Sequence, residues 1–68
     1  MKDSFPTRLK ELRFNAKLSQ QALAKQIGAT QKAIDFWEKG INEPKASFII
    51  KLAIYFEVST DYLLGLEN

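Results

Sequence analysis

The side chains able to do chemistry in this 68-residue chain are almost all Lys, Arg, Asp and Glu, because the sequence contains no histidine and no cysteine. The usual general bases, thiol nucleophiles and soft metal ligands are therefore missing. Ser47 and Ser59 are hydroxyl nucleophiles by type, but no base accompanies either of them. The sequence thus predicts that the chain is not an enzyme, and it indicates no disulfide, no metal site and no cofactor.

The charged side chains are divided unevenly along the sequence. Residues 1–32 carry seven basic and two acidic side chains, whereas residues 33–68 carry three basic and six acidic ones. A basic half and an acidic half indicate that one face meets a polyanion while another faces away from it. Uneven scatter of charge in a small soluble domain explains the same pattern, so charge alone leaves both interpretations open.

Length and hydropathy set the expected class of protein. A chain of 7.8 kDa is expected to form one domain, at residues 1–68 with its core at about 5–65. Residues 1–6 are too polar for a signal sequence. The longest apolar run, residues 52–56, is far shorter than the roughly 20 residues that a membrane span needs. We therefore expect a soluble protein of a reducing compartment, the cytoplasm, without a membrane partner.

Apolar residues recur at spacings of three and four, which predicts an all-α chain of five short helices. Pro6 suits the first turn of the first helix, with Asp3 or Ser4 as its cap. The other helices are expected at residues 20–27, 31–39, 46–56 and 60–64. Three of them have a side chain that can cap the amino end, namely Ser19, Thr30 and Ser59.

Residues 20–37 have the pattern of a helix-turn-helix. Two helices of about eight residues meet through a turn of only a few residues, so they must cross at a steep angle. Ala24 is the small residue that this crossing needs, and Gly28 supplies the positive φ that the turn requires. The positions that must face the body of the domain are all apolar: Leu23, Ile27, Ile34 and Trp37.

Over residues 7–65 the chain resembles the Cro/repressor-type (XRE-family) DNA-binding domain of phage and bacterial regulators. The resemblance rests on LKELR at 9–13, LSQQALA at 18–24, IG at 27–28, WEKG at 37–40 and VSTDYLLG at 58–65, together with Ile34 and Pro44. It implies a compact five-helix, lambda-repressor-like domain whose second and third helices form the helix-turn-helix. Members of this family typically bind operators as dimers.

The resemblance implies that the helix at 31–39 enters the major groove of DNA. There a Gln amide can pair with adenine, and a Lys can donate to guanine O6 and N7. Asp35 could accept from cytosine N4 or simply orient a neighbouring Lys, Lys32 or Lys39. Phe36 stands where a polar side chain is usual, and it could pack on a thymine methyl group or a sugar, or bind protein instead. The implied base-contacting residues are Gln31, Lys32, Ala33, Asp35 and Phe36.

Phosphate contacts are implied at the start of the second helix and in the loop after the third. A helix amino end offers free N–H groups and partial positive charge to a phosphate. The implied phosphate-contacting residues are Gln20, Thr30, Lys39, Asn42 and Lys45. Arg13 and Glu38 match a pair that ties the first helix to the end of the third, and a partly buried salt bridge between them is expected. Lys17 and Glu57 occupy helix ends that often hold glycine in this family; if they adopt positive φ, each costs roughly 1 kcal/mol.

Two classes of function follow from these residues. The first is sequence-specific binding of double-stranded DNA and transcriptional repression by a homodimer, at least on DNA, with its dimer surface near residues 41–45 and the fifth helix. The second is a protein-interaction module of the same fold, antitoxin-like or regulatory, which contacts protein through Phe14, Phe36 and Ile54. A positive face shared by Gln20, Lys32 and Lys45 would favour DNA, and an acidic or apolar face would favour the module. No small-molecule substrate is evident.

Overall fold

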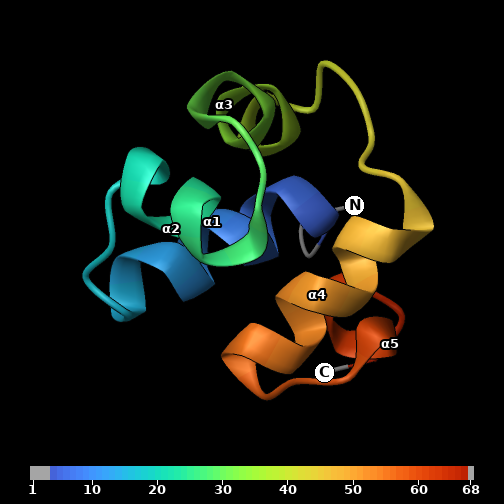
Figure 1. The fold of residues 1–68 in the computed structure, drawn as a ribbon. Coiled ribbons are helices and arrows are strands. Elements are labelled where there is room, and N and C mark those ends of the chain that lie inside the picture. Colours follow the sequence, from blue (N-terminus) through green and yellow to red (C-terminus); the bar gives the residue numbers. More distant parts are fainter. Residues whose placement is uncertain (1–3, 68) are drawn as a thin grey trace.

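The computed structural model describes residues 4–67, and this range folds into five α-helices (Figure 1). They are α1 (Phe5–Asn15), α2 (Gln20–Ile27), α3 (Gln31–Lys39), α4 (Ala46–Phe56) and α5 (Thr60–Leu63). The all-α prediction is confirmed, and α2, α3 and α4 have the expected bounds. α5 ends one residue earlier than expected, because the Gly65 N–H bonds back only three residues, to the Tyr62 carbonyl at 3.0 Å.

Hydroxyl side chains begin three of the helices, as predicted. Ser19, Thr30 and Ser59 each accept a hydrogen bond from the backbone N–H three residues further on, at 3.0, 3.1 and 2.9 Å. Each bond satisfies an N–H that has no partner within the helix. Ser4 takes the cap position of α1 without a capping hydrogen bond, and the alternative cap, Asp3, lies outside the described residues.

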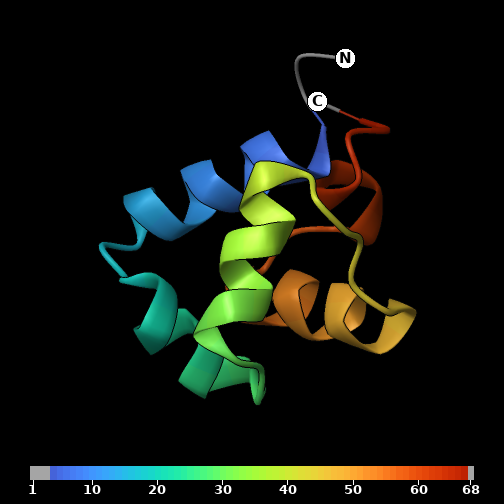
Figure 2. The same ribbon diagram turned by 90° about the horizontal axis from the view of Figure 1, so that it is seen from above.

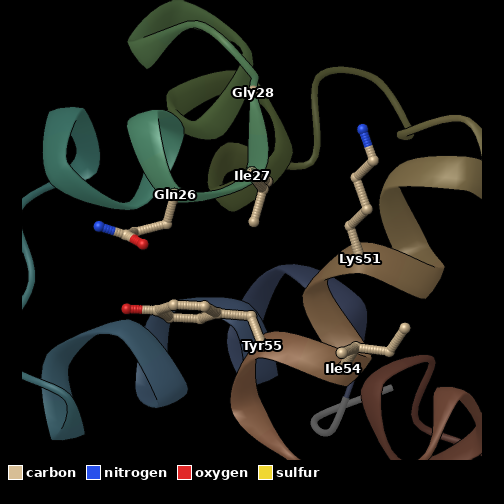
Figure 3. Close-up of a pocket in the computed structure, with 6 residues that line it drawn as sticks. All are labelled: Gln26, Ile27, Gly28, Lys51, Ile54 and Tyr55. Carbon is tan, nitrogen blue, oxygen red and sulfur yellow. The ribbon is translucent and has the colours of Figure 1, made fainter.

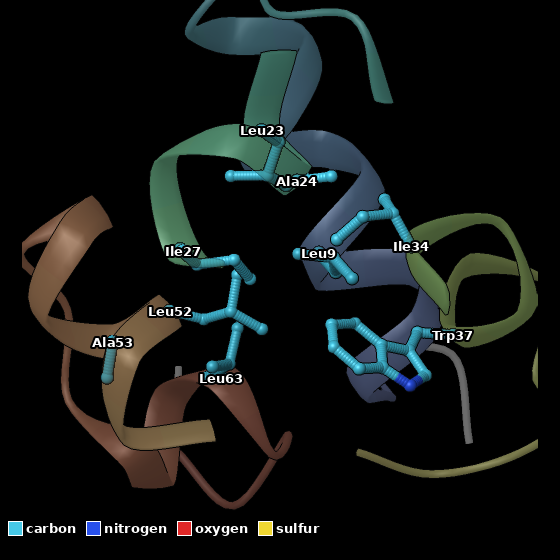
Figure 4. Close-up of a cluster of buried hydrophobic side chains, with 9 residues drawn as sticks. All are labelled: Leu9, Leu23, Ala24, Ile27, Ile34, Trp37, Leu52, Ala53 and Leu63. Carbon is cyan, nitrogen blue, oxygen red and sulfur yellow. The ribbon is translucent and has the colours of Figure 1, made fainter. Parts of the chain in front are cut away.

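All five helices contribute to one hydrophobic core (Figure 4). Each helix provides one completely buried side chain, and burying an aliphatic side chain of this size stabilises the fold by about 1.5–3 kcal/mol. These residues are Leu9, Leu23, Ile34, Leu52 and Leu63. Within this core α3 packs mainly on α2 and α1, so these two helices set its position.

The crossing of α2 and α3 has the predicted residues at the predicted places. Ala24 is buried, and Gly28 ends α2 with φ at +75°. Figure 1 views α3 nearly end-on, whereas Figure 2 shows it lengthwise, with α1 and α2 on one side of it and α4 and α5 on the other. In Figure 1 α3 is therefore the helix at the top edge of the domain.

Two helix ends hold a residue other than glycine at positive φ, as the sequence indicated. The φ angle is +59° at Lys17 and +58° at Glu57. A side chain with a Cβ atom loses roughly 1 kcal/mol in this conformation. The two connections thus carry a small amount of backbone strain.

Replacing Glu57 by glycine is expected to raise the free energy of unfolding by up to about 1 kcal/mol, since glycine has no Cβ to strain. In a domain of this size such a gain raises the thermal midpoint by roughly 4–8 °C. Thermal unfolding followed by circular dichroism measures the shift. The matched variant Glu57→Ala keeps the Cβ and should stay near the wild-type midpoint; an equal rise in both variants would show that strain at φ is not the cause.

Candidate nucleic-acid interface

The amino end of α3 projects away from the body of the domain. Thr30, Gln31 and Lys32 are exposed, whereas Ile34 and Trp37 on the opposite side of the helix are buried. The Thr30 hydroxyl oxygen already accepts from the backbone as a cap, but its O–H is still a donor. Of the side chains expected to meet DNA bases, Gln31 and Lys32 are therefore exposed, whereas Ala33, Asp35 and Phe36 are half-buried.

A buried ion pair ties α3 to α1. The Arg13 guanidinium donates to both carboxylate oxygens of Glu38, from Nε to Oε2 at 2.6 Å and from Nη2 to Oε1 at 3.0 Å. Its third nitrogen, Nη1, donates to the Leu18 carbonyl at 2.8 Å. The two side chains are only 8% and 3% exposed. The hydrogen bond to Glu38 raises the pKa of Arg13. The expected pair is thus present, and it also fixes the connection between α1 and α2.

Gln20 extends this network to α2. Its Nε2 lies 3.2 Å from Asp35 Oδ1 and 3.2 Å from Glu38 Oε1, so the amide N–H groups point at two carboxylates of α3. In this arrangement the side chain has no further N–H to give to a phosphate. A phosphate contact at Gln20 requires either rotation of the amide or use of the helix amino end itself.

Asp35 pairs with Lys39 one helical turn further on, at 3.0 Å between Oδ2 and Nζ. The hydrogen bond from Lys39, and then that from Gln20, holds the pKa of Asp35 below its ordinary value of 3.8. The pair therefore stabilises the fold at pH above that value, and the contribution is lost as the pH falls through the lowered pKa. Of the two roles expected for Asp35, this geometry is that of orienting a lysine.

The remaining expected contacts lie on and after α3. Lys32 and Phe36 face each other across one turn, with Nζ 5.5 Å from the ring centroid, and Ala33 is half-buried beside them. Asn42 and Lys45 are exposed in the segment that leads into α4. The first turns of α2, α3 and α4 contain no acidic residue, so the partial positive charge of these helix ends is not neutralised locally.

Arg8 has a structural role that the sequence reading missed. Arg8 counts among the charges of the basic half of the sequence, but its side chain is buried. Its Nη1 donates to the Tyr62 carbonyl at 2.8 Å, and its guanidinium lies 4.1 Å from the centroid of the Tyr62 ring. It joins α1 to α5 rather than offering charge to a partner. Its spacing of three from Phe5 and four from Leu12, both on the inner side of α1, is the signal that could have placed it.

A surface hollow of about 430 Å³ between the end of α2 and α4 involves none of the residues expected to contact DNA (Figure 3). Its walls include Ile27, Ile54 and Tyr55, with Lys51 at one side. Within residues 4–67 no group of three His, Cys, Asp or Glu side chains could hold a metal ion. No helix of that range is long and apolar enough to cross a membrane. The described residues that line the hollow therefore form no metal site.

These features define a helix-turn-helix domain. Gly28 ends the helix before a short turn, the amino end of the next helix is exposed, and polar contacts join that helix to α1 and α2. The sequence pattern of the family described as helix-turn-helix matches residues 9–63, and the chain belongs to this family. The resemblance to the Cro/repressor type is thereby confirmed.

Three known proteins illustrate the relationship. The uncharacterized HTH-type transcriptional regulator YqaE of Bacillus subtilis is 38% identical over 64 residues, which are 94% of this chain and 55% of that protein. The c2 repressor of Salmonella phage P22, in complex with a synthetic operator, has a TM-score of 0.88 and 31% identity, covering 94% of this chain and 97% of that one. The restriction-modification controller protein C.AhdI of Aeromonas hydrophila has a TM-score of 0.79 and 32% identity, covering 87% and 89%.

The fold and the class of protein agree with these relatives. The five-helix, lambda-repressor-like architecture is confirmed by the likeness to the P22 repressor domain. YqaE and the P22 protein are regulators by name, which agrees with the expectation that the chain is not an enzyme. The chain spans about half the length of the three Bacillus subtilis regulators that it matches, at 55%, 54% and 51%.

Proposed function

We propose that this chain binds double-stranded DNA sequence-specifically as a transcriptional repressor, with α3 in the major groove. The observation that carries the proposal is its likeness to the P22 c2 repressor, whose structure was solved on an operator. The exposed amino end of α3 supports it, because Gln31 and Lys32 there have the donors that read adenine and guanine. Such a protein acts where the DNA is, so we place it in the cytoplasm.

The contacts fall into two groups in this proposal. Side chains on α3 approach base edges, while helix amino ends and lysines hold the phosphates and so fix the register. The base-contacting group is Gln31, Lys32, Ala33, Asp35 and Phe36. The phosphate-contacting group is Gln20, Thr30, Lys39, Asn42 and Lys45. Residues 1–68 act as a single domain, and Arg13 and Glu38 hold its reading helix in place.

A homodimer on DNA is part of the proposal, since one domain of this size reads only a few base pairs. Two copies related by a two-fold axis would bind half-sites about one helical turn apart. Ile41 and Leu64 are exposed near the segment expected at the dimer surface, and so is Leu66. Leu64 also lines a hollow of about 150 Å³, together with Phe5 and Pro44. Exposed apolar side chains next to a hollow suit self-association.

Selection of bound duplexes from a random DNA pool, at a stated salt concentration, tests the function directly. We expect enrichment of one site with two-fold symmetry. Equal retention of all duplexes would overturn the proposal. In that case the protein-interaction module becomes the better hypothesis, since Phe14 and Ile54 are exposed as that alternative requires.

Replacing Gln20 by alanine is expected to weaken binding to all duplexes alike, by about tenfold if one hydrogen bond to a charged phosphate is lost. The dissociation constants for the selected site and for a scrambled site measure this. Gln26→Ala, at the other end of α2, is the matched control and should change neither. A change in sequence preference for Gln20→Ala would show that Gln20 acts on base reading, through its contacts with Asp35 and Glu38.

A further inference from the structure

The polar side chains on the outer side of α3 are not equally free to read a base. Asp35 has both carboxylate oxygens engaged, since Oδ1 accepts from Gln20 and Oδ2 pairs with Lys39. A cytosine amino group would have to share one of these oxygens with its present partner. The exposed side chains of the helix that keep their donors are therefore those nearer its amino end, above all Lys32.

Lys32 has one close partner, and that partner is an aromatic ring. Its Nζ lies 5.5 Å from the ring centroid of Phe36, four residues further on and on the same face of the helix. This distance is within the range of a cation–π interaction. Among residues 4–67 Lys32 forms no ion pair, and the carboxylate of Asp35 pairs with Lys39. Phe36 is half-buried, so part of its side chain remains accessible.

On the basis of the function proposed above, we propose that Lys32 and Phe36 form one specificity-determining unit that selects a guanine next to a thymine. The ring attracts the ammonium charge without accepting a conventional hydrogen bond, so the N–H groups that point away from it can donate to guanine O6 and N7. The ring also restrains a flexible side chain that would otherwise sample the phosphates. Its exposed part is apolar and matches the C5-methyl group of thymine, the apolar group of the major groove.

Base analogues in the selected duplex test each half of the unit. Replacing the guanine by 7-deazaguanine removes the N7 acceptor, and we expect binding to weaken by about tenfold. Replacing the thymine by deoxyuridine removes only the methyl group, and we expect a loss of about fourfold. Both losses are measured on the wild-type chain at one salt concentration.

Variants then assign the two losses to the two residues. Lys32→Ala should abolish the 7-deazaguanine loss and keep the deoxyuridine loss. Phe36→Leu keeps an apolar contact but removes the π face, so it should keep the deoxyuridine loss and reduce the 7-deazaguanine loss. Lys51→Ala is the matched control, because it removes a second Lys–Phe pair, with Nζ 5.3 Å from the Phe48 ring on α4, and should change neither.

The outcomes separate this inference from the function on which it rests. If Lys32→Ala and Phe36→Leu keep both losses at wild-type size while the chain still prefers its selected site, the inference is wrong and the function stands. If the wild-type chain shows no preference among duplexes, both are wrong. Lys32 is exposed, so Lys32→Ala gives a folded test protein even if Phe36→Leu does not.

Discussion

Alanine in place of Glu38 is expected to lower the free energy of unfolding by about 3 kcal/mol, because it leaves the Arg13 guanidinium charged, buried and without its carboxylate. The two side chains are 3% and 8% exposed, so water cannot take the place of the lost partner. A domain of this size has only roughly 3–5 kcal/mol of stability in total. Urea unfolding followed by circular dichroism should therefore find the variant close to unfolded without denaturant.

Two further variants identify the cause of this loss. If the cost comes from the unpaired charge, the double variant Arg13→Met with Glu38→Leu should be more stable than Glu38→Leu alone, since both ionic groups are gone. Lys39→Ala removes the partner of Asp35 in the exposed pair of the same helix and should hardly move the midpoint. An unchanged midpoint for Glu38→Ala would mean that the pair contributes nothing to stability.

The fold was predictable because its signals are local. The caps at Ser19, Thr30 and Ser59 and the glycine that ends α2 act within a few residues of their own positions, and the structure has them as expected. The positive φ at Glu57 follows from the same kind of signal. Such features can be predicted from the residue types and their spacing within one helix, and a single sequence contains that information.

Side-chain direction across helices was harder to predict. The sequence places Gln20 at the amino end of α2, where a phosphate contact is reasonable, but only the packing of α2 on α3 turns its amide toward Asp35 and Glu38. Arg8 shows the same limit, since a count of charges cannot distinguish a buried guanidinium from an exposed one. The pair of Arg13 and Glu38, 25 positions apart, came from the family resemblance and not from spacing.

The polar network connects stability to recognition. Arg13, Glu38 and Gln20 come from three different helices, and together they fix the angle at which α3 leaves the domain. A reading helix has to hold its side chains within a fraction of an ångström of the base edges. The buried pair of Arg13 and Glu38 is therefore expected to serve recognition as well as stability.

The salt dependence of DNA binding is expected to be the largest effect of solution conditions. Each phosphate that a lysine neutralises releases counterions, which steepens the fall of affinity with salt. If the dimer neutralises four phosphates through two copies of Lys39 and Lys45, raising the salt from about 50 to about 200 mM weakens binding by about a hundredfold. Fluorescence anisotropy titrations of the selected duplex over this range measure the slope.

Single substitutions measure how much Lys39 and Lys45 each contribute to the salt dependence. Lys45 is exposed at the amino end of α4, with no ion pair among residues 4–67, so Lys45→Gln should make the log–log slope shallower by about one for each subunit. Lys39 is already paired with Asp35, so its net contribution is smaller and Lys39→Gln should change the slope less. Lys51→Gln, on α4 outside the expected interface, is the control. A slope near zero for the wild-type chain would exclude phosphate contacts as the source of affinity, and equal slopes for Lys45→Gln and Lys51→Gln would remove Lys45 from them.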